Sequence, residues 1–389
     1  MHVASLKDIK NGKVTDAYFF RTLEILKTKK IKKHVKAEFI AKNLPCDWQW
    51  GVLAGIEECA ELLKDLKVSV RSMREGTIFR PYQPVMEIEG EYTDFGIYET
   101  ALLGFLCQAS GIATRAARCK KAAGMRGVIS FGARRMHPSI APMIERNAYI
   151  GGCDGVATLK AADLIGEKAT GTMPHTLIII MGDSTSASKA FDEVIDRNVN
   201  RIALVDTFGD EKFEALNVAR ALGDNLFGVR LDTPGSRRGD FYRILEEVRW
   251  ELNLRGFNKI KLLVSGGIDE QEILKLNHFV DAYGVGTAIS NASVVDFSMD
   301  IIEMDGVPVA KRGKMSGSKR VVRCPECLKS KIVPYSEGKI NCECGGKTED
   351  LLLPFIVNRS LKEPLPEAKE IRKYVLKQLE KFPLDKNIE

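Results

Sequence analysis

Two strand-and-glycine units between residues 260 and 289 constrain the fold of this chain more than any other feature. The apolar run Ile260–Val264 is typical of a strand buried on both faces of a parallel sheet, and it stops at a Ser-Gly-Gly turn. The next apolar run, Ala282–Val285, stops in the same way at Gly286 and Thr287. Between the two runs, Asp269 is placed to cap a short helix.

Glycines at the carboxyl ends of neighbouring strands let backbone N–H groups approach a phosphate, because no Cβ stands in the way. In α/β barrels this rim carries the active site, and the last strands commonly hold a phosphate. One glycine pair is typical of an ordinary tight turn. Two pairs in successive β–α units favour a phosphate site.

The same alternation of short apolar strands and helices extends back to Gly127. About six strands are clear, which is fewer than a closed eight-stranded barrel needs. We therefore predict an α/β protein whose residues 111–300 form an α/β barrel, incomplete and TIM-like, with a doubly wound open sheet as the alternative. The predicted strands are 128–130, 177–180, 202–205, 228–231, 260–264 and 282–285, with a further one within 152–159.

Residues 1–110 predict an N-terminal α+β domain that ends in a long helix over 97–124. Within it, residues 85–89 alternate with period two, which indicates a strand with one face in solvent. Residues 301–322 form a basic Gly/Ser segment that returns to this domain. Such a run is either a solvated linker or a mobile loop that faces a phosphate.

Four cysteines near the C-terminus predict a small zinc-ribbon-like module over 323–350. Cys324 and Cys327 form a C-x-x-C pair, and Cys342 and Cys344 form a C-x-C pair. Two such pairs suit a tetrahedral Zn²⁺ site with four thiolates and no open position, so we expect a structural role. A helical segment follows over 351–389.

Composition places the chain among soluble globular proteins, with 44% hydrophobic and 28% charged residues. A net charge of +6, spread along the sequence, suits an anionic substrate better than a nucleic-acid surface. We expect a cytoplasmic protein without a membrane segment, because no apolar run has spanning length and the nine cysteines do not read as a disulfide framework.

Polar and charged residues follow the predicted strands, at the rim where barrels carry out chemistry. Any one of them is typical of a surface loop, but the whole set indicates a site. Arg134 follows the first strand together with the aromatic Phe131, Asp206 ends its strand, and Arg230 and Asp232 flank Leu231. Asp154 follows the Gly151-Gly152 turn, and His175 stands just before the strand predicted at 177–180.

Residues 11–323 resemble the nicotinate phosphoribosyltransferase family of type II phosphoribosyltransferases. The resemblance rests on an ordered set of motifs: T-D-A-Y, F-G-A-R-R, G-T-M-P-H, V-R-L-D-T-P-G, V-S-G-G-I-D and Y-G-V-G-T. It implies an α/β barrel beside an N-terminal domain, and active sites shared between the subunits of at least a dimer. It also implies the transfer of a phosphoribosyl group from phosphoribosyl pyrophosphate, with Mg²⁺, to nicotinate in NAD salvage.

The resemblance assigns roles to individual residues. Tyr18 of a neighbouring subunit and Phe131 sandwich the pyridine ring, Arg230 binds its carboxylate, and Asp232 holds ribose hydroxyls. Arg134, Asp16 and Asp206 also belong to the expected substrate site. The expected phosphate contacts are Ser265, Gly266, Gly267, Gly284, Gly286 and Thr287.

His175 matches the family's histidine that ATP phosphorylates to drive product formation, and imidazole nitrogen is a competent nucleophile. Asp154 leaves nicotinamide open as an alternative substrate, because a carboxylate repels nicotinate but accepts a hydrogen bond from an amide. Quinolinate is less favoured, since it needs more cationic groups. A different class remains open, an RNA-binding zinc-ribbon protein that uses Arg312, Lys314 and Lys319.

Overall fold

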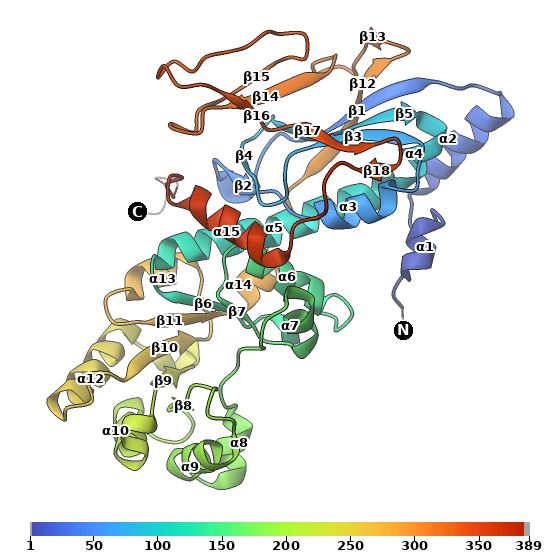
Figure 1. The fold of residues 1–389 in the computed structure, drawn as a ribbon. Coiled ribbons are helices and arrows are strands. Elements are labelled where there is room, and N and C mark those ends of the chain that lie inside the picture. Colours follow the sequence, from blue (N-terminus) through green and yellow to red (C-terminus); the bar gives the residue numbers. More distant parts are fainter. Residues whose placement is uncertain (1, 385–389) are drawn as a thin grey trace. The chain divides into compact units, whose positions relative to one another are not determined.

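The computed structural model describes residues 2–384, which divide into two compact units (Figure 1). One unit contains the described residues up to Thr114 together with those from Ser293 onward, and the other is Arg115–Ala292. Helix α5 (Glu99–Ala123) contributes its first part to one unit and its last part to the other. Within residues 2–384, every helix is too short or too polar to cross a bilayer.

The second unit is built on a six-stranded parallel sheet with the order β7-β6-β11-β10-β9-β8. No pairing joins β7 to β8 among the described residues, so the sheet stays open. This confirms the predicted α/β class with a parallel sheet of fewer than eight strands. The strands are β6 (Gly127–Ser130), β7 (Gly155–Val156), β8 (Ile202–Leu204), β9 (Gly228–Leu231), β10 (Lys261–Ser265) and β11 (Ala282–Val285).

The strand predicted at 177–180 is wrong, because these residues lie in helix α8 (His175–Met181). Only Ile178 of the apolar run is buried, while Ile179 and Ile180 are 59% and 76% exposed. A short apolar run does not distinguish a buried strand from a helix segment by periodicity. The helix ends where Gly182 adopts a φ of +94°, a left-handed conformation that favours glycine.

Aspartates begin four helices of this unit, each by accepting a backbone hydrogen bond in the first turn. One of them is Asp269, as predicted. The Asp-capped helices are α9 (Ser184–Val194), α10 (Glu211–Leu222), α12 (Phe241–Leu254) and α13 (Glu270–Leu276). The remaining helices are α6 (Ala141–Ile150), α7 (Leu159–Ile165), α11 (Gly235–Arg238) and α14 (Thr287–Ser290).

The first unit is built on a seven-stranded antiparallel sheet with the order β13-β12-β1-β5-β3-β17-β18. The helices of this unit are α1 (Leu6–Lys10), α2 (Ala17–Thr28), α3 (Ile56–Leu63), α4 (Tyr92–Phe95), the start of α5, and α15 (Ala368–Leu379). The strands are β1 (His34–Ala41), β3 (Val68–Ser72), β5 (Pro84–Glu91), β12 (Phe297–Met304), β13 (Val307–Pro308), β17 (Leu353–Val357) and β18 (Ser360–Leu361). Two smaller sheets pair β2 (Gly51–Val52) with β4 (Ile78–Phe79), and β14 (Lys319–Arg323) with β15 (Ser330–Pro334) and β16 (Glu349–Asp350).

A row of buried carboxylates crosses this sheet and bears on two predictions, the solvated face of residues 85–89 and the solvated or mobile basic segment 301–322. Glu87, Glu38 and Asp300 lie opposite one another on β5, β1 and β12, and each is at most 4% exposed. The face of residues 85–89 expected in solvent is therefore buried at Glu87, and only Glu89 on that face stays partly exposed. Burial of these carboxylates is offset by cations that contact them.

Two of those cations come from the basic segment 301–322. Lys319 Nζ lies 2.9 Å from Glu38 Oε2, and Lys314 Nζ contacts both Asp300 and Ser298 Oγ. The side chains of Lys314 and Lys319 are only 5% and 7% exposed. Of the three cations that the RNA-binding alternative requires, only Arg312 is thus exposed, and that alternative loses its basis.

Glu99, the first residue of α5, gives this unit a pH-dependent stability. Burial raises the pKa of Glu99 to about 7 from 4.5, with Asp300 and Asp16 adding to the effect and Lys311 opposing it. Between these values the folded state keeps a proton that the unfolded chain releases, so stability falls as pH rises through this window. We expect Glu99→Gln to raise the unfolding free energy at pH 8 by on the order of 1 kcal/mol and to have little effect at pH 4.

Chemical denaturation of the variant and the parent at both pH values measures this difference. Glu61→Gln is the matched control, because the pKa of Glu61 is lowered by hydrogen bonds from Lys10 and Lys64 and its removal gives no gain at pH 8. Equal gains from Glu99→Gln at pH 4 and pH 8 would contradict the prediction.

Candidate active site

Arg230 and Phe131 form an aromatic and cationic pair at the carboxyl edge of the parallel sheet. Arg230 lies on β9 with its Cζ 5.9 Å from the centre of the Phe131 ring, which follows β6. One guanidinium nitrogen donates to Thr172 Oγ1 at 2.5 Å, whereas Nε is buried and has no hydrogen-bond partner among the described residues. Burial lowers the pKa of Arg230, while the nearby Asp232 and Asp206 raise it. A half-buried guanidinium whose buried Nε–H has no partner among the described residues is suited to an anionic ligand.

Gly284 on β11 makes room for the Phe131 ring. A Cβ at this position would lie 2.3 Å from Phe131 Cδ2, so any other residue would displace the ring. Gly132, directly after the phenylalanine, is equally confined, since its Cβ would lie 2.3 Å from Ser290 Cβ. Gly284 on β11 and Gly132, two residues after β6, therefore fix the position of the Phe131 ring, the aromatic wall of the site.

His175 lies between two carboxylates at the same edge. Its Nε2 is 3.6 Å from Asp232 Oδ2 and 3.8 Å from Asp206 Oδ2, and its Nδ1 is 3.0 Å from Thr207 Oγ1. The Asp206 side chain is 1% exposed and accepts no hydrogen bond from another side chain within residues 2–384. Burial raises its pKa, and the His175 charge is the main opposing influence.

Asp232 connects this cluster to the double-glycine turn. Its Oδ1 accepts a hydrogen bond from Ser265 Oγ at 2.6 Å. Gly266 and Gly267 follow with φ values of +79° and +67°, which glycine adopts without strain. A Cβ on Gly266 would lie 3.0 Å from Asp232 Oδ1, whereas nothing lies within 4 Å of one on Gly267. The turn thus places two glycines of left-handed conformation beside an aspartate. Glycine turns of this kind are a common setting for anion binding by backbone N–H groups.

Gly286 directly follows β11, and Thr287 begins α14 at the same edge. The structure also brings Arg134 near, because its charge contributes to the lowered pKa of Arg230. Asp154 is not part of the cluster. It lies at the opposite, amino edge of the sheet, where its Oδ2 accepts from Lys120 Nζ and from the Val128 amide, both at 2.8 Å. This removes the observation that had favoured nicotinamide.

Asp16 and Tyr18 belong to the other unit and stand at the start of α2. Asp16 Oδ2 accepts from Thr100 Oγ1 at 2.8 Å, and it makes no side-chain cap of its helix. Tyr18 is 58% exposed, so its ring is accessible to another molecule.

Three residues of the cluster were not predicted from the sequence. Thr172 and Thr207 orient Arg230 and His175, and Arg238 donates to the carbonyls of Thr233, Ser265 and Gly266. Thr172 lies within the G-T-M-P-H motif, and Thr207 directly follows Asp206. The two adjacent arginines shortly after the L-D-T-P-G run could have indicated that Arg238 belongs to the site.

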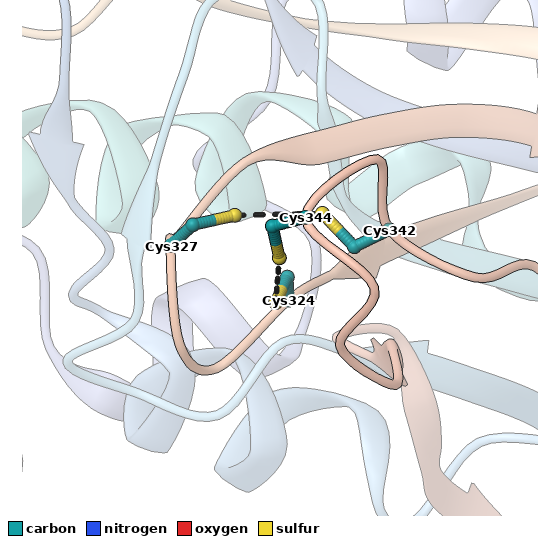
Figure 2. Close-up of side chains that lie close together, drawn as sticks. All are labelled: Cys324, Cys327, Cys342 and Cys344. Carbon is teal, nitrogen blue, oxygen red and sulfur yellow. Dashed lines mark hydrogen bonds between the residues drawn. The ribbon is translucent and has the colours of Figure 1, made fainter.

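The four predicted metal ligands lie together in the other unit (Figure 2). All four sulfur atoms are within 4.8 Å of one another, with 3.6 Å between Cys324 and Cys344 and 3.4 Å between Cys327 and Cys342. Tetrahedral zinc with four thiolates separates its sulfurs by about 3.8 Å. Hydrogen bonds from the Cys344 backbone and from neighbouring thiols lower the pKa of Cys342 to about 7, whereas the pKa of Cys344 is raised to about 12 because its thiol shares hydrogen bonds with the other three. The cluster therefore fits Zn²⁺.

Comparison with known proteins agrees with this geometry. The family profiles of the N-terminal and C-terminal domains of quinolinate phosphoribosyl transferase match residues 16–110 and 112–300. The fold and the site thus define a phosphoribosyltransferase. A solved structure described as nicotinate-nucleotide pyrophosphorylase from Pyrococcus furiosus is 56% identical, covers 99% of both chains and has a TM-score of 0.97.

A curated relative, nicotinate phosphoribosyltransferase pncB1 of Mycobacterium tuberculosis, is 28% identical over 79% of this chain and 76% of its own length. Human nicotinic acid phosphoribosyltransferase, at 20% identity, shares the fold with a TM-score of 0.77 over 95% of this chain and 94% of its own. The chain belongs to the nicotinate phosphoribosyltransferase family of type II phosphoribosyltransferases.

Proposed function

We propose that the protein joins nicotinate to phosphoribosyl pyrophosphate and releases nicotinate mononucleotide and pyrophosphate, a step of NAD salvage. The observation that carries this proposal is the half-buried Arg230, whose buried Nε has no hydrogen-bond partner within residues 2–384 and whose Cζ lies 5.9 Å from the centre of the Phe131 ring. A flat ring with one carboxylate matches an aromatic wall and a guanidinium fork. Relatives named nicotinate phosphoribosyltransferase support the reaction.

The remaining cluster suits the phosphoribosyl group. In this proposal Asp232 accepts hydrogen bonds from ribose hydroxyls and the Gly266–Gly267 turn binds the 5′-phosphate. The hydrogen bond that joins Asp232 to Ser265, directly before the turn, supports this assignment. Positive charge develops on the ribose as pyrophosphate leaves, so positioning and electrostatic stabilisation supply most of the catalysis. Mg²⁺ would neutralise the pyrophosphate, and the hard oxygen ligands available to it are the carboxylates of Asp206 and Asp232.

The proposal includes at least a homodimer, in which the exposed Tyr18 of one copy completes the aromatic sandwich of its neighbour. Nicotinamide is not favoured, since Asp154 lies at the other edge of the sheet. Quinolinate is not favoured in this proposal because it carries a second carboxylate, and Arg230 is the cation proposed to bind the ring carboxylate.

Product formation tests the proposal directly. The purified protein is incubated with phosphoribosyl pyrophosphate and Mg²⁺ and with nicotinate, nicotinamide or quinolinate in parallel, and mononucleotides are separated by chromatography. We expect nicotinate mononucleotide as the main product. Turnover of quinolinate or nicotinamide in preference to nicotinate would overturn the choice of substrate, and turnover of none would overturn the reaction.

Coupling to ATP is proposed to proceed through His175, because its imidazole is held by Thr207 and two carboxylates. We expect γ-labelled ATP to leave an acid-labile phosphate on the wild-type protein and not on His175→Asn. ATP should also cease to stimulate product formation in that variant. His137→Asn is the control, since His137 is exposed in the loop before α6. Labelling of His175→Asn at the wild-type level would exclude this role.

A further inference from the structure

A buried ion pair, Arg118 with Glu270, lies at the start of the helix that follows the Gly266–Gly267 turn, the turn proposed to bind the 5′-phosphate. Glu270, the first residue of α13, is 4% exposed and receives two hydrogen bonds of 2.9 Å from Arg118 Nε and a terminal nitrogen of Arg118. Arg118 lies on the part of α5 that belongs to the same unit and is 1% exposed. Arg115, one turn earlier, lies 3.7 Å from the same carboxylate.

Helix α13 is short, and its two ends are held differently. Near its C-terminal end, Tyr283 Oη donates to the Ile273 carbonyl at 3.2 Å, and Asn277 donates to the Ala122 carbonyl at 2.9 Å. Its N-terminal end follows directly on Gly266 and Gly267, where the buried Ile268 and the Glu270 pair hold it. The Glu270 pair therefore holds the helix end to which the turn leads, while Arg238 donates to the Ser265 and Gly266 carbonyls of the turn itself.

A gain in folding stability is a weak explanation for why the fold buries such an ion pair. Removing two charges from water costs about as much as their attraction returns, so a buried ion pair often stabilises no more than apolar residues of similar volume. A bidentate guanidinium–carboxylate pair does fix geometry, because both groups are planar and the two hydrogen bonds set their mutual orientation.

We propose that Arg118 and Glu270 are positioning residues that hold the Gly266–Gly267 turn in the orientation required to bind a ribose 5-phosphate group. This inference rests on the proposed function. Part of the affinity for the sugar phosphate then depends on the Arg118–Glu270 pair, although neither residue contacts the ligand. Affinity for the pyridine ring, which Phe131 and Arg230 bind, does not depend on the pair.

Ribose 5-phosphate is the probe, because its binding does not depend on which pyridine the enzyme uses. In Glu270→Gln the amide loses the charge and one of the two acceptor positions at unchanged volume. We expect the Kd for ribose 5-phosphate, measured by calorimetry, and the KM for phosphoribosyl pyrophosphate to rise about tenfold. The KM for nicotinate should stay within about twofold, which a general loosening of the fold would not allow.

Asp192→Asn is the matched control. Asp192 on α9 accepts from the 5%-exposed Arg201 at 2.7 Å, and Arg201 directly precedes β8 at the opposite, amino edge of the sheet. The double variant Arg118→Met/Glu270→Met is the second test, since it removes both members of the bidentate pair, while the Arg115 side chain keeps 21% of its surface exposed to water. This variant should keep the thermal midpoint while still weakening ribose 5-phosphate binding.

An unchanged Kd in both pair variants would overturn the inference, and so would an equal rise in Asp192→Asn or a joint rise of both KM values. A wild-type protein that binds ribose 5-phosphate but turns over no pyridine would contradict the proposed reaction, while the Kd comparison would still decide the role of the pair. A wild-type protein that binds no ribose 5-phosphate would overturn both.

Discussion

Arg230→Met is expected to lower kcat/KM for nicotinate by roughly 10²–10³-fold, which corresponds to about 3–4 kcal/mol of lost transition-state stabilisation. Methionine keeps much of the volume beside Phe131 but removes the guanidinium that the ring carboxylate requires. The loss should be much smaller with nicotinamide, since that ring carries no charge. Steady-state kinetics with both substrates, at saturating phosphoribosyl pyrophosphate, measure the difference.

Arg249→Met is the control for this experiment. Burial also lowers the pKa of Arg249, but this residue donates to the Ile260 carbonyl at the amino edge of the sheet. Its replacement should affect stability and leave the ratio of nicotinate to nicotinamide turnover unchanged. Equal losses with both pyridines in Arg230→Met would show that Arg230 supports the fold rather than the carboxylate.

Metal removal is expected to have the largest effect on stability. Four thiolates without a metal lose the cross-link between the two loops that carry them, and metal binding at such sites is coupled to folding. We expect a chelator, or Cys342→Ser, to lower the first thermal transition by at least about 5 °C. At 25 °C the still-folded protein should retain its turnover, because the four-cysteine cluster and the parallel sheet belong to different units.

Elemental analysis before and after chelation gives the zinc content, and scanning calorimetry gives the transition. Cys46→Ser is the control, since Cys46 is exposed and lies outside the cluster. Loss of turnover in an apo protein with an unchanged thermal transition would contradict a structural role for the metal.

The strands of the parallel sheet were predictable because each is a short apolar run that ends at a turn residue. The runs at β6, β9, β10 and β11 and the Asp269 cap follow from local patterns, and the structure agrees with them. The run in α8 has the same composition, but the chain exposes two of its isoleucines. Composition does not specify which side of a segment other elements will cover, so residues 177–180 were compatible with both a buried strand and a helix.

The candidate site was predictable as a set of residue types and less so as an arrangement. His175, Asp206, Arg230 and Asp232 meet because parallel strands bring their carboxyl ends to one edge. Asp154 directly precedes the two-residue strand β7 instead of following it. It therefore lies at the amino edge of the sheet, beside Val128, and not at the carboxyl edge with the other candidate residues.

The glycine-ended strands, the helix caps and the two cysteine pairs follow from the local sequence, since each depends on residues within a few positions of one another. The partners of the buried charges follow from the tertiary fold instead: Lys319 pairs with Glu38, and Arg118 pairs with Glu270. These pairs join residues far apart in the chain. Burial in a medium of low polarity requires each charge to find a partner, but the fold, and not the local sequence, determines which partner is within reach.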